Sequence, residues 1–160
     1  MTKIAKTNAM RILDKAKIEY TPLTYIPNEE DLSGTTVASQ IGLDAEIVFK
    51  TLTAKGDKTG VCVFCIPSCC ELDLKKAAKV SGNKSVELLH VKDLLSVTGY
   101  IRGGCSPVGM KKNYPVFIDE TALDYEKITV SAGIKGCQLL LSSSKLISFV
   151  NATVENITIK

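Results

Sequence analysis

The spacing of apolar residues along the chain predicts a mixture of helices and strands. Apolar residues recur every three or four positions in 3–17, which is typical of an amphipathic helix. Residues 20–22 are expected to end this helix, and 23–26 has the pattern of a short strand. A second short helix is predicted from the next group of apolar residues at helical spacing, which comprises Val37, Ala38 and Ile41.

Two β-type runs near the middle of the chain are predicted to form a hairpin. Residues 47–54 and 60–66 are rich in β-branched and aromatic side chains, and the linker 55–59 has hairpin length. Further strands are predicted at 115–118, 127–130 and 138–141, and further helices at 72–80, 91–97 and 144–150. Because these elements do not alternate as regular βαβ units, they indicate an α+β fold with a largely antiparallel or mixed sheet.

The composition is that of one compact domain, and we expect residues 1–160 to form it. Of the 160 residues, 45% are hydrophobic, which is enough to bury a core. The net charge of +3 is too small to identify a nucleic-acid-binding protein or to exclude one. No apolar run approaches the roughly 18 residues of a membrane span. The N-terminal residues also lack the apolar block of a signal peptide, so we expect a cytoplasmic protein without a membrane partner.

The six cysteines are expected to be reduced thiols, because the chain shows no export signal. Cys62 and Cys65 have CxxC spacing, but residues three apart in a strand point to opposite faces. Cys69 and Cys70 follow closely, so a zinc or redox site on these four cysteines stays open as an alternative. The second ligand pair of a zinc ribbon is missing, which favours buried cysteines acting as small apolar residues.

The most unusual stretch is the segment 99–112, which we call the glycine loop. It contains four glycines, Pro107 and three cations between two apolar segments. Glycine permits a ligand to approach the backbone closely, and the cations Arg102, Lys111 and Lys112 favour an anionic or polarised oxygen, such as that of a phosphate or an ester. The alternative is a solvated turn rich in glycine and proline.

Two familiar catalytic motifs do not fit the glycine loop. Gly109 is followed by Met110 rather than by the lysine and hydroxyl residue of a phosphate-binding P-loop. The spacing around Ser106 has one residue too many for a G-x-S-x-G nucleophile elbow. Ser106 is therefore a weak nucleophile candidate, and Cys105 has no partner at a diagnostic spacing that would convert it to a thiolate.

Lys50 is the second candidate for a functional residue, because it interrupts the apolar run 47–54. A strand lysine that projects into a cleft supplies a fixed charge for an anionic or carbonyl oxygen, whereas one on an exposed edge strand protects against aggregation. Both interpretations stay open on residue type alone. Thr51 and Thr53 should lie on the opposite face of the strand, so a strand without a bulge is not expected to direct all three residues at one site.

The remaining titratable candidates carry weaker signals. His90 precedes a predicted helix and has no carboxylate or cysteine at a diagnostic spacing, which favours a surface or helix-capping histidine over a catalytic base. Asp119, Glu120 and Asp124 fall in a polar turn between predicted strands. We expect these three carboxylates to be solvated rather than paired.

With these residues identified, the sequence resembles the YbaK/EbsC family of the prolyl-tRNA editing-domain superfamily. The most specific similarity lies in residues 98–112, where the part from Gly103 to Pro107 is similar to the family's G-x-x-x-P loop. Supporting similarity lies in the lysine-bearing strand and two later segments, which are 48–52, 74–79 and 129–136. The four pieces occur in the family's order, and the resemblance covers nearly the whole chain.

The resemblance implies a curved mixed sheet flanked by helices, with a cleft at the lysine and the glycine loop. It implies hydrolysis of mischarged Cys-tRNA(Pro) with no cofactor, no metal and no protein nucleophile. Within the family, the thiol of the substrate cysteine is thought to attack its own ester. The implied partners are aminoacyl-tRNA and, as a candidate, prolyl-tRNA synthetase, with no DNA and no membrane.

The resemblance also implies roles for individual residues. Lys50 and Gly104 correspond to catalytic positions, where a charge and backbone N–H groups can stabilise an oxyanion. Substrate-binding roles are implied for Tyr25, Thr51, Gly103, Cys105, Ser106, Pro107, Ser131 and Gly133. Relatives usually have an aliphatic residue in place of Cys105, so its thiol is not expected to be catalytic. Ile134-Lys135 replaces a common basic pair, so we expect weaker phosphate binding by that loop.

Three other functions stay open from the sequence. An editing deacylase of other specificity, such as one for Ala-tRNA(Pro), would cleave a different ester. A non-catalytic module would bind tRNA or a nucleotide and leave aminoacyl esters intact. A redox or zinc protein would use the cysteines at positions 62, 65, 69 and 70.

Overall fold

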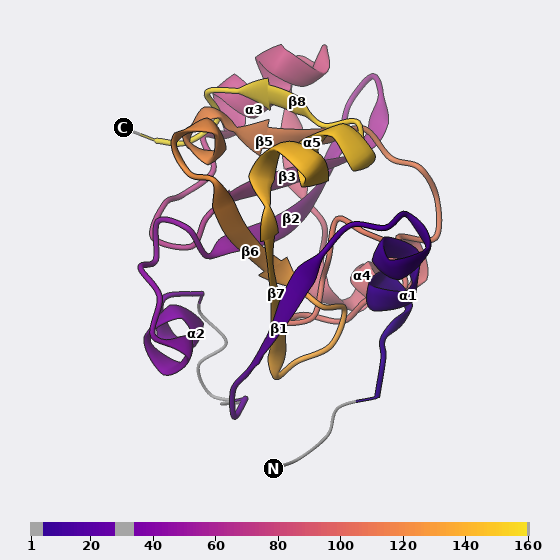
Figure 1. Cartoon of the computed structure of the whole chain (residues 1–160). Coiled ribbons are helices and arrows are strands. Elements are labelled where there is room, and N and C mark those ends of the chain that lie inside the picture. The colour runs from indigo at the N-terminus through magenta and orange to yellow at the C-terminus, as the bar shows by residue number, and fades with distance from the viewer. Residues whose placement is uncertain (1–4, 28–33, 160) are drawn as a thin grey trace.

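The computed structural model describes residues 5–27 and 34–159, whose strands form two sheets (Figure 1). One sheet has the strand order β1-β7-β6 and the other the order β4-β2-β3-β5-β8. The strands are β1 (Tyr20–Thr24), β2 (Phe49–Gly56), β3 (Gly60–Pro67), β4 (Val86–Leu88), β5 (Val116–Asp119), β6 (Lys127–Ser131), β7 (Cys137–Ser142) and β8 (Thr153–Glu155). The predicted α+β class is confirmed, although the expected single sheet is divided in two and joined by a bridge between Val48 and Thr129.

Both sheets are largely antiparallel, as predicted. The smaller sheet is antiparallel throughout, and in the larger one β2 runs antiparallel to both β3 and β4. Within the sheets, the parallel pairs are those of β5 with β3 and with β8, and the bridge between Val48 and Thr129 is also parallel. In Figure 1 the three-stranded sheet stands in front of the five-stranded sheet, with α1 and α2 on opposite sides of it.

Each of the five predicted helices is present. They are α1 (Asn8–Lys15), α2 (Gly34–Ile41), α3 (Leu74–Ser81), α4 (Val91–Thr98) and α5 (Ser143–Phe149), and a 3-10 helix, η1 (Glu120–Asp124), was not predicted. The first helix begins later than the predicted residue 3, because the Thr7 side chain accepts a hydrogen bond from Met10 N and caps the helix there. Residues 3 and 4 of that prediction lie outside the described part of the chain.

The predicted hairpin is confirmed, with β2 and β3 paired from Phe49↔Pro67 to Gly56↔Gly60. Residues 20–22 do not simply end the first helix, because they form the start of β1. Pro22 is compatible with this strand, because β7 is the single strand that pairs with β1 in the described part of the chain, and a missing N–H donor costs little in an edge strand. The three-residue strands β4 and β8 were not predicted.

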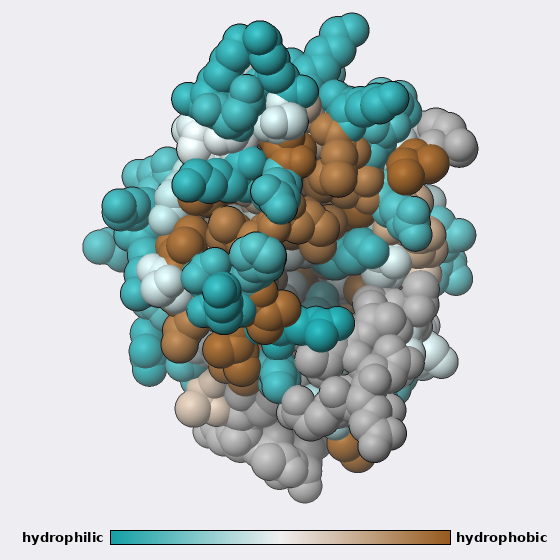
Figure 2. All heavy atoms as spheres, turned by 180° about the vertical axis from the view of Figure 1, so that it is seen from behind, coloured by the Kyte–Doolittle hydropathy of each residue, from teal (hydrophilic) through white to brown (hydrophobic). Residues whose placement is uncertain are grey.

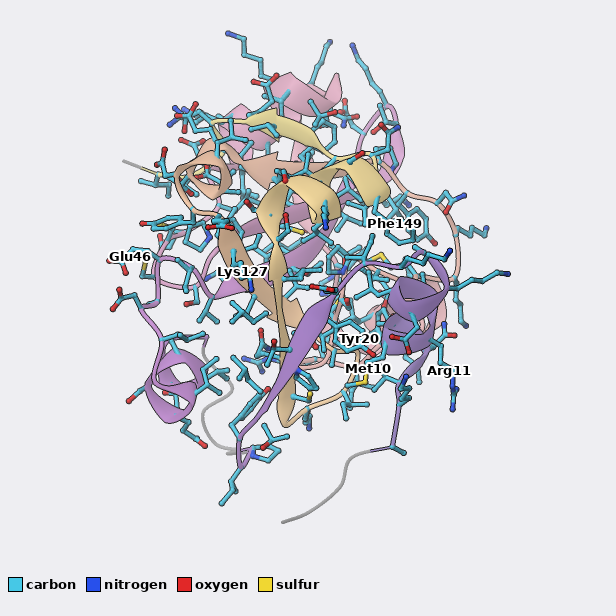
Figure 3. All side chains as sticks on the ribbon, in the orientation of Figure 1. Met10, Arg11, Tyr20, Glu46, Lys127 and Phe149 are labelled. Atoms are coloured by element: carbon cyan, nitrogen blue, oxygen red, sulfur yellow. The ribbon has the colours of Figure 1, made fainter. Side chains whose placement is uncertain are left out.

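Two clusters of buried apolar residues cover the opposite faces of the larger sheet. The first lies between the sheets and includes Met10 and Leu13 of α1, and the second lies under α3 and includes the stacked rings of Phe64 and Phe117, 5.4 Å apart. Figure 3 shows how α1 contributes, since Met10 and Tyr20 lie on its inner side and Arg11 points outward. Burial of both sheet faces explains why the central strands are almost continuously apolar.

The CxxC pair is divided between these two clusters. Cys62 belongs to the cluster under α3, and Cys65 belongs to the cluster between the sheets, as strand alternation predicts. Among the described residues, no three His, Cys, Asp or Glu side chains are grouped so that they could hold a metal ion. In the same residues, no helix has both the length and the apolar content needed to cross a membrane.

The expectation that Asp119 is solvated is wrong. This carboxylate is fully buried at the end of β5. Its Oδ1 accepts a hydrogen bond from Ile157 N at 3.1 Å, and its Oδ2 accepts bonds from the N and Oγ1 of Thr121 at 3.3 and 2.7 Å. A carboxylate with several donors can stay buried, and here it ties the C-terminal segment to the sheet.

We therefore predict that Asp119→Ala lowers the free energy of unfolding by about 3 kcal/mol, because it leaves buried donors without an acceptor. The matched control is Asp124→Ala, which removes an exposed carboxylate from η1 and should change stability by less than about 0.5 kcal/mol. Urea unfolding followed by circular dichroism measures both values. Equal stabilities of the two variants would contradict the structural role of Asp119.

Candidate functional site

In residues 5–27 and 34–159, no strand borders the first half of β2 on one of its edges. On that edge, Ile47 O accepts a hydrogen bond from Thr129 N at 2.8 Å, and Thr53 O accepts one from Leu89 N at 3.0 Å. Pairing with β4 then begins at Ala54. Because backbone groups of alternate residues point to the same edge of a strand, the N–H and C=O of Thr51 also lie there. Among the described residues, none forms a backbone hydrogen bond with them.

A cavity of about 610 Å³ lies along this free edge. Its other walls come from α2, α4, the glycine loop and the ends of β6 and β7. The lining residues are Tyr25, Val37, Val48, Phe49, Lys50, Thr51, Leu52, Thr53, Ser68, Leu88, Leu89, Val91, Leu94, Arg102, Gly103, Cys105, Ser131 and Gln138. Figure 2, the view from behind, shows apolar surface gathered beside a hollow near the middle of this face.

Six of the ten residues predicted for the site line this one cavity, namely Lys50, Tyr25, Thr51, Gly103, Cys105 and Ser131. Tyr25 is held beside the β6–β7 loop by a hydrogen bond from its N–H to Gly136 O at 2.9 Å. Two larger hollows, of about 740 and 950 Å³, lack Lys50. The site that the sequence predicted thus corresponds to a cavity smaller than either of these hollows.

The other four predicted residues do not line the cavity. Gly104 packs against the β6–β7 loop, where an added Cβ would stand 3.1 Å from the backbone carbons of Ile134. Its N–H donates to Ile101 O at 3.0 Å, so this donor is not free for an oxyanion. Ser106 is fully buried and accepts a bond from Val108 N, and Pro107 lines the 740 Å³ hollow. Gly133 lies behind Ser131, whose Oγ accepts its N–H at 3.1 Å.

Lys50, Thr51 and Thr53 line the same cavity although β2 has no bulge, which corrects the expectation from strand alternation. Lys50 pairs with Ile66 of the cluster under α3, whereas Thr51 pairs with Cys65 of the cluster between the sheets. The two residues therefore do lie on opposite faces of the sheet. They meet at one site because the cavity opens at the edge of the strand, where both faces end.

The buried thiols beside the threonines are poor nucleophiles. Cys105 Sγ lies 3.9 Å from Thr53 Oγ1, and burial raises the pKa of this thiol despite the hydroxyl neighbour. Cys65 Sγ lies 3.7 Å from Thr51 Oγ1, and burial raises its pKa to about 12. Both side chains keep their protons at neutral pH, so Cys105 forms part of the wall rather than a reactive centre.

Some lining residues were not predicted as site residues. Arg102 was noted only as one of the three cations of the glycine loop, and its position directly before Gly103 was the available signal. Gln138 interrupts an apolar run much as Lys50 does, and it reaches the cavity because its strand pairs it with Ser131. The apolar wall from Leu88 to Leu94 carried no signal, because its residues look like ordinary helix and strand positions.

The lining is positively charged in the part of the chain that the structure describes. Lys50 and Arg102 are its charged residues, and no Asp or Glu is among them. Within residues 5–27 and 34–159, no hydrogen bond or ion pair engages the Lys50 ammonium. His90 is exposed at the N-cap position of α4 and does not line the cavity. The cavity can therefore attract anionic or strongly polarised oxygens.

Known proteins share both the sequence and the fold of this chain. A protein of Enterococcus faecalis, provisionally named Cys-tRNA(Pro)/Cys-tRNA(Cys) deacylase EbsC, is 48% identical over 97% of this chain and 94% of its own length. The uncharacterized protein YwhH of Bacillus subtilis is 24% identical over 76% of this chain and 78% of its own. A crystal structure provisionally described as a trans-editing enzyme for prolyl-tRNA synthetase has a TM-score of 0.80 at 22% identity, covering 95% of this chain and 97% of that one.

The sequence profile of the aminoacyl-tRNA editing domain matches residues 30–149. This range contains β2, the glycine loop and the β6–β7 pair, and thus every described lining residue of the cavity except Tyr25. The matched range therefore covers most of the helices and strands and nearly all described residues of the cavity lining. The chain belongs to the aminoacyl-tRNA editing domain family.

Proposed function

We propose that this protein is an aminoacyl-tRNA deacylase that hydrolyses mischarged Cys-tRNA(Pro), with the cavity along β2 as its active site. The main support for the proposal is that Lys50 lines the same cavity as the glycine loop, including its cation Arg102. The chain is 48% identical to EbsC, whose name assigns this reaction. In this proposal residues 1–160 act as a single domain.

The cavity has the size and charge that an aminoacylated terminal nucleotide requires. Its volume of about 610 Å³ lies within the range of roughly 300 to 1,000 Å³ usual for small-molecule sites. The Lys50 ammonium has no partner among the described residues, so it can hold the ester carbonyl oxygen as negative charge develops there. Arg102 is exposed at the rim, where it can pair with a phosphate of the acceptor end.

The free edge of β2 offers a second set of contacts. The N–H of Thr51 can donate to the substrate and its C=O can accept, as a neighbouring strand would do at this edge. Ser131 also lines the cavity and keeps its hydroxyl hydrogen available, because its Oγ acts as acceptor toward Gly133 N. These groups bind and orient a polar substrate without transferring protons.

The nucleophile in this proposal comes from the substrate. The cysteinyl sulfur forms a bond to the carbonyl carbon of its own ester, and the ester C–O bond breaks. The thiol proton passes to the departing ribose oxygen, and water then opens the cyclic thioester to release cysteine. Such an intramolecular attack needs orientation more than acid or base catalysis, and orientation can supply several kcal/mol. This fits a described lining with no histidine and no carboxylate.

We also propose where the protein acts and which protein is its partner. The site of action is the cytoplasm, where aminoacyl-tRNA is made. Prolyl-tRNA synthetase is the candidate partner, because it is the source of mischarged tRNA(Pro). A twofold or smaller effect of added synthetase on the deacylation rate would favour a protein that acts alone.

We predict that Lys50→Ala lowers the deacylation rate about a hundredfold with little change in stability, because one electrostatic contact to a developing oxyanion is worth roughly 2.7 to 4 kcal/mol. Lys55→Ala is the matched control, since Lys55 lies on the same strand but is exposed and does not line the cavity. Release of labelled cysteine from Cys-tRNA(Pro) measures the rate. A folded Lys50→Ala protein as active as the Lys55→Ala control would refute the role.

We predict that Cys105→Ala keeps most of the activity, at least about a third of the wild-type rate, because burial keeps this thiol protonated. The same variant should lose only modest stability, since a small apolar group is removed next to Thr53. Single-turnover deacylation together with thermal unfolding checks both parts. Complete inactivation with normal stability would instead indicate covalent catalysis by the Cys105 thiol.

We predict that Cys-tRNA(Pro) is cleaved at least about a hundredfold faster than Ser-tRNA(Pro) or Ala-tRNA(Pro), because only the cysteinyl group carries a strong internal nucleophile. S-methylation of the cysteinyl group should protect the ester while binding persists. The rate on Cys-tRNA(Pro) should rise with pH toward the ordinary thiol pKa of about 8.5. Equal rates for the cysteinyl and seryl esters at saturating enzyme would point to a water molecule activated by the protein.

A further inference from the structure

Two loops form one wall of the cavity and are packed against each other. The glycine loop contributes Arg102, Gly103 and Cys105, and the β6–β7 loop, residues 132–136, joins the strand ends that contribute Ser131 and Gln138. One contact between them is the backbone of Gly104 against that of Ile134 and Lys135, described above. A single contact of this kind leaves the loops free to rotate about it, so a second contact is needed to fix their relative position.

Tyr100 supplies the second contact. A Cβ built at Gly133 would stand 3.0 Å from Tyr100 Cε1, so the ring edge lies against the β6–β7 loop. A Cβ built at Gly109 would stand 2.9 Å from the Tyr100 hydroxyl, which donates a hydrogen bond to Val108 O at the far end of the glycine loop. Tyr100 therefore touches both ends of its own loop and the facing loop at once.

The glycine at 133 is required by this packing as well as by its backbone. Its φ of +99° is a conformation that residues with a side chain rarely adopt. The same residue donates its N–H to Ser131 Oγ, which lines the cavity. A shift of the Tyr100 ring would therefore displace Gly133 and, through this hydrogen bond, Ser131.

The start of the glycine loop is held equally closely. Thr98 is fully buried, and its Oγ1 accepts a hydrogen bond from Tyr100 N at 3.0 Å while it donates one to Leu94 O at 2.7 Å. Arg102 and Gly103, which line the cavity, follow Tyr100 by two and three residues. The position of Tyr100 therefore sets where these two residues enter the cavity wall.

We propose that Tyr100 is a positioning residue, which clamps the glycine loop to the β6–β7 loop and so fixes Gly103 and Ser131 relative to Lys50. It is not a catalytic residue, because it is 9% exposed and does not line the cavity. The effect of this clamp on the deacylation rate rests on the function proposed above. Misplacement of reacting groups by about 1 Å can lower a rate by roughly a hundredfold, so a clamp of this kind acts on turnover.

The Tyr100 hydroxyl can serve as a permanent donor. Burial raises the pKa of Tyr100 to about 12, so the phenol keeps its proton over the whole pH range in which the protein would be assayed. A tyrosine is suited to this position because its rigid ring spans the two glycines and its hydroxyl reaches a main-chain carbonyl. Phenylalanine would keep the ring contact with Gly133 and lose the bond to Val108 O.

The first test compares Tyr100→Phe with Tyr114→Phe. Tyr114 is the matched control, because its hydroxyl also donates to a main-chain carbonyl, Val97 O at 2.8 Å, but lies outside the cavity wall. We expect Tyr100→Phe to lower kcat for Cys-tRNA(Pro) about tenfold with KM changed less than twofold, and Tyr114→Phe to change neither. If both variants lose stability alike and both keep the wild-type kcat, Tyr100 is merely structural and the proposal fails.

The second test uses glycine variants with similar backbone strain. Gly133→Ala should lower kcat about a hundredfold, because its methyl group displaces the Tyr100 ring. Gly82→Ala is the control, since Gly82 has a φ of +80° but an added Cβ would meet nothing within 4 Å. Loss of kcat in both variants to the same extent would show that strain alone is responsible and would overturn the clamp.

A measurement independent of activity separates this proposal from the proposed function. In Tyr100→Leu, which removes both the ring contact with Gly133 and the hydroxyl, amide hydrogen exchange at residues 101–105 and 133–136 should accelerate together by about tenfold, and Tyr114→Leu should leave both segments unchanged. If the wild-type protein cleaves no aminoacyl-tRNA, the proposed function fails while this exchange result still decides the clamp. Exchange that accelerates in only one of the two loops would refute it.

Discussion

The free edge of β2 is the constraint on which the candidate site depends. An unpaired strand edge exposes main-chain donors and acceptors and is ordinarily covered or interrupted. Here β6 covers the edge at Val48 and β4 covers it from Ala54, which leaves a gap between them. The glycine loop and α4 close this gap without pairing with the strand, so the space that remains is a cavity with polar main-chain groups on one side.

The same constraint explains the composition of the cavity lining. Side chains from both faces of β2 reach the edge, so a charged residue and two hydroxyl residues can meet although they alternate along the strand. The opposite wall contains only the ends of strands, so little regular geometry is imposed on it. Its shape depends on two glycine-containing loops that pack backbone to backbone, as at Gly104 and Ile134, and such close packing gives rigidity without bulky side chains.

Local patterns in the sequence were sufficient to predict most elements of the fold. The five helices have apolar stripes, and the hairpin of β2 and β3 has two apolar runs around a turn. The strands β4 and β8 could not be predicted in this way, because three residues carry too little periodicity and their pairing partners are distant in the chain. Asp119 was misread for the same reason, since its donor at Ile157 is 38 residues away.

The site could be predicted in part. Lys50 and the glycine loop could be recognised because a cation in an apolar strand and a cluster of glycines are both unusual and both indicate a functional site. In the structure they line the same cavity. The function of each glycine could not be read from its type. Gly104 has its N–H bonded to Ile101 O and faces another loop, whereas Gly103 beside it lines the cavity. That difference depends on tertiary packing, which spacing alone does not encode.

The chemistry of the cavity bears on how an editing enzyme could select its substrate. Cysteine, serine and alanine differ by one small group, and a pocket that recognises size alone separates such side chains by roughly 10- to 200-fold. A described lining of cations, hydroxyls and apolar groups, without a carboxylate or histidine, is suited to holding the common parts of all three esters. Selection then has to come from reactivity rather than from fit. A site that orients the ester and stabilises its oxyanion can achieve this, because the three esters differ most in whether they carry their own nucleophile. The property that the protein must supply is then a rigid arrangement of the surrounding loops.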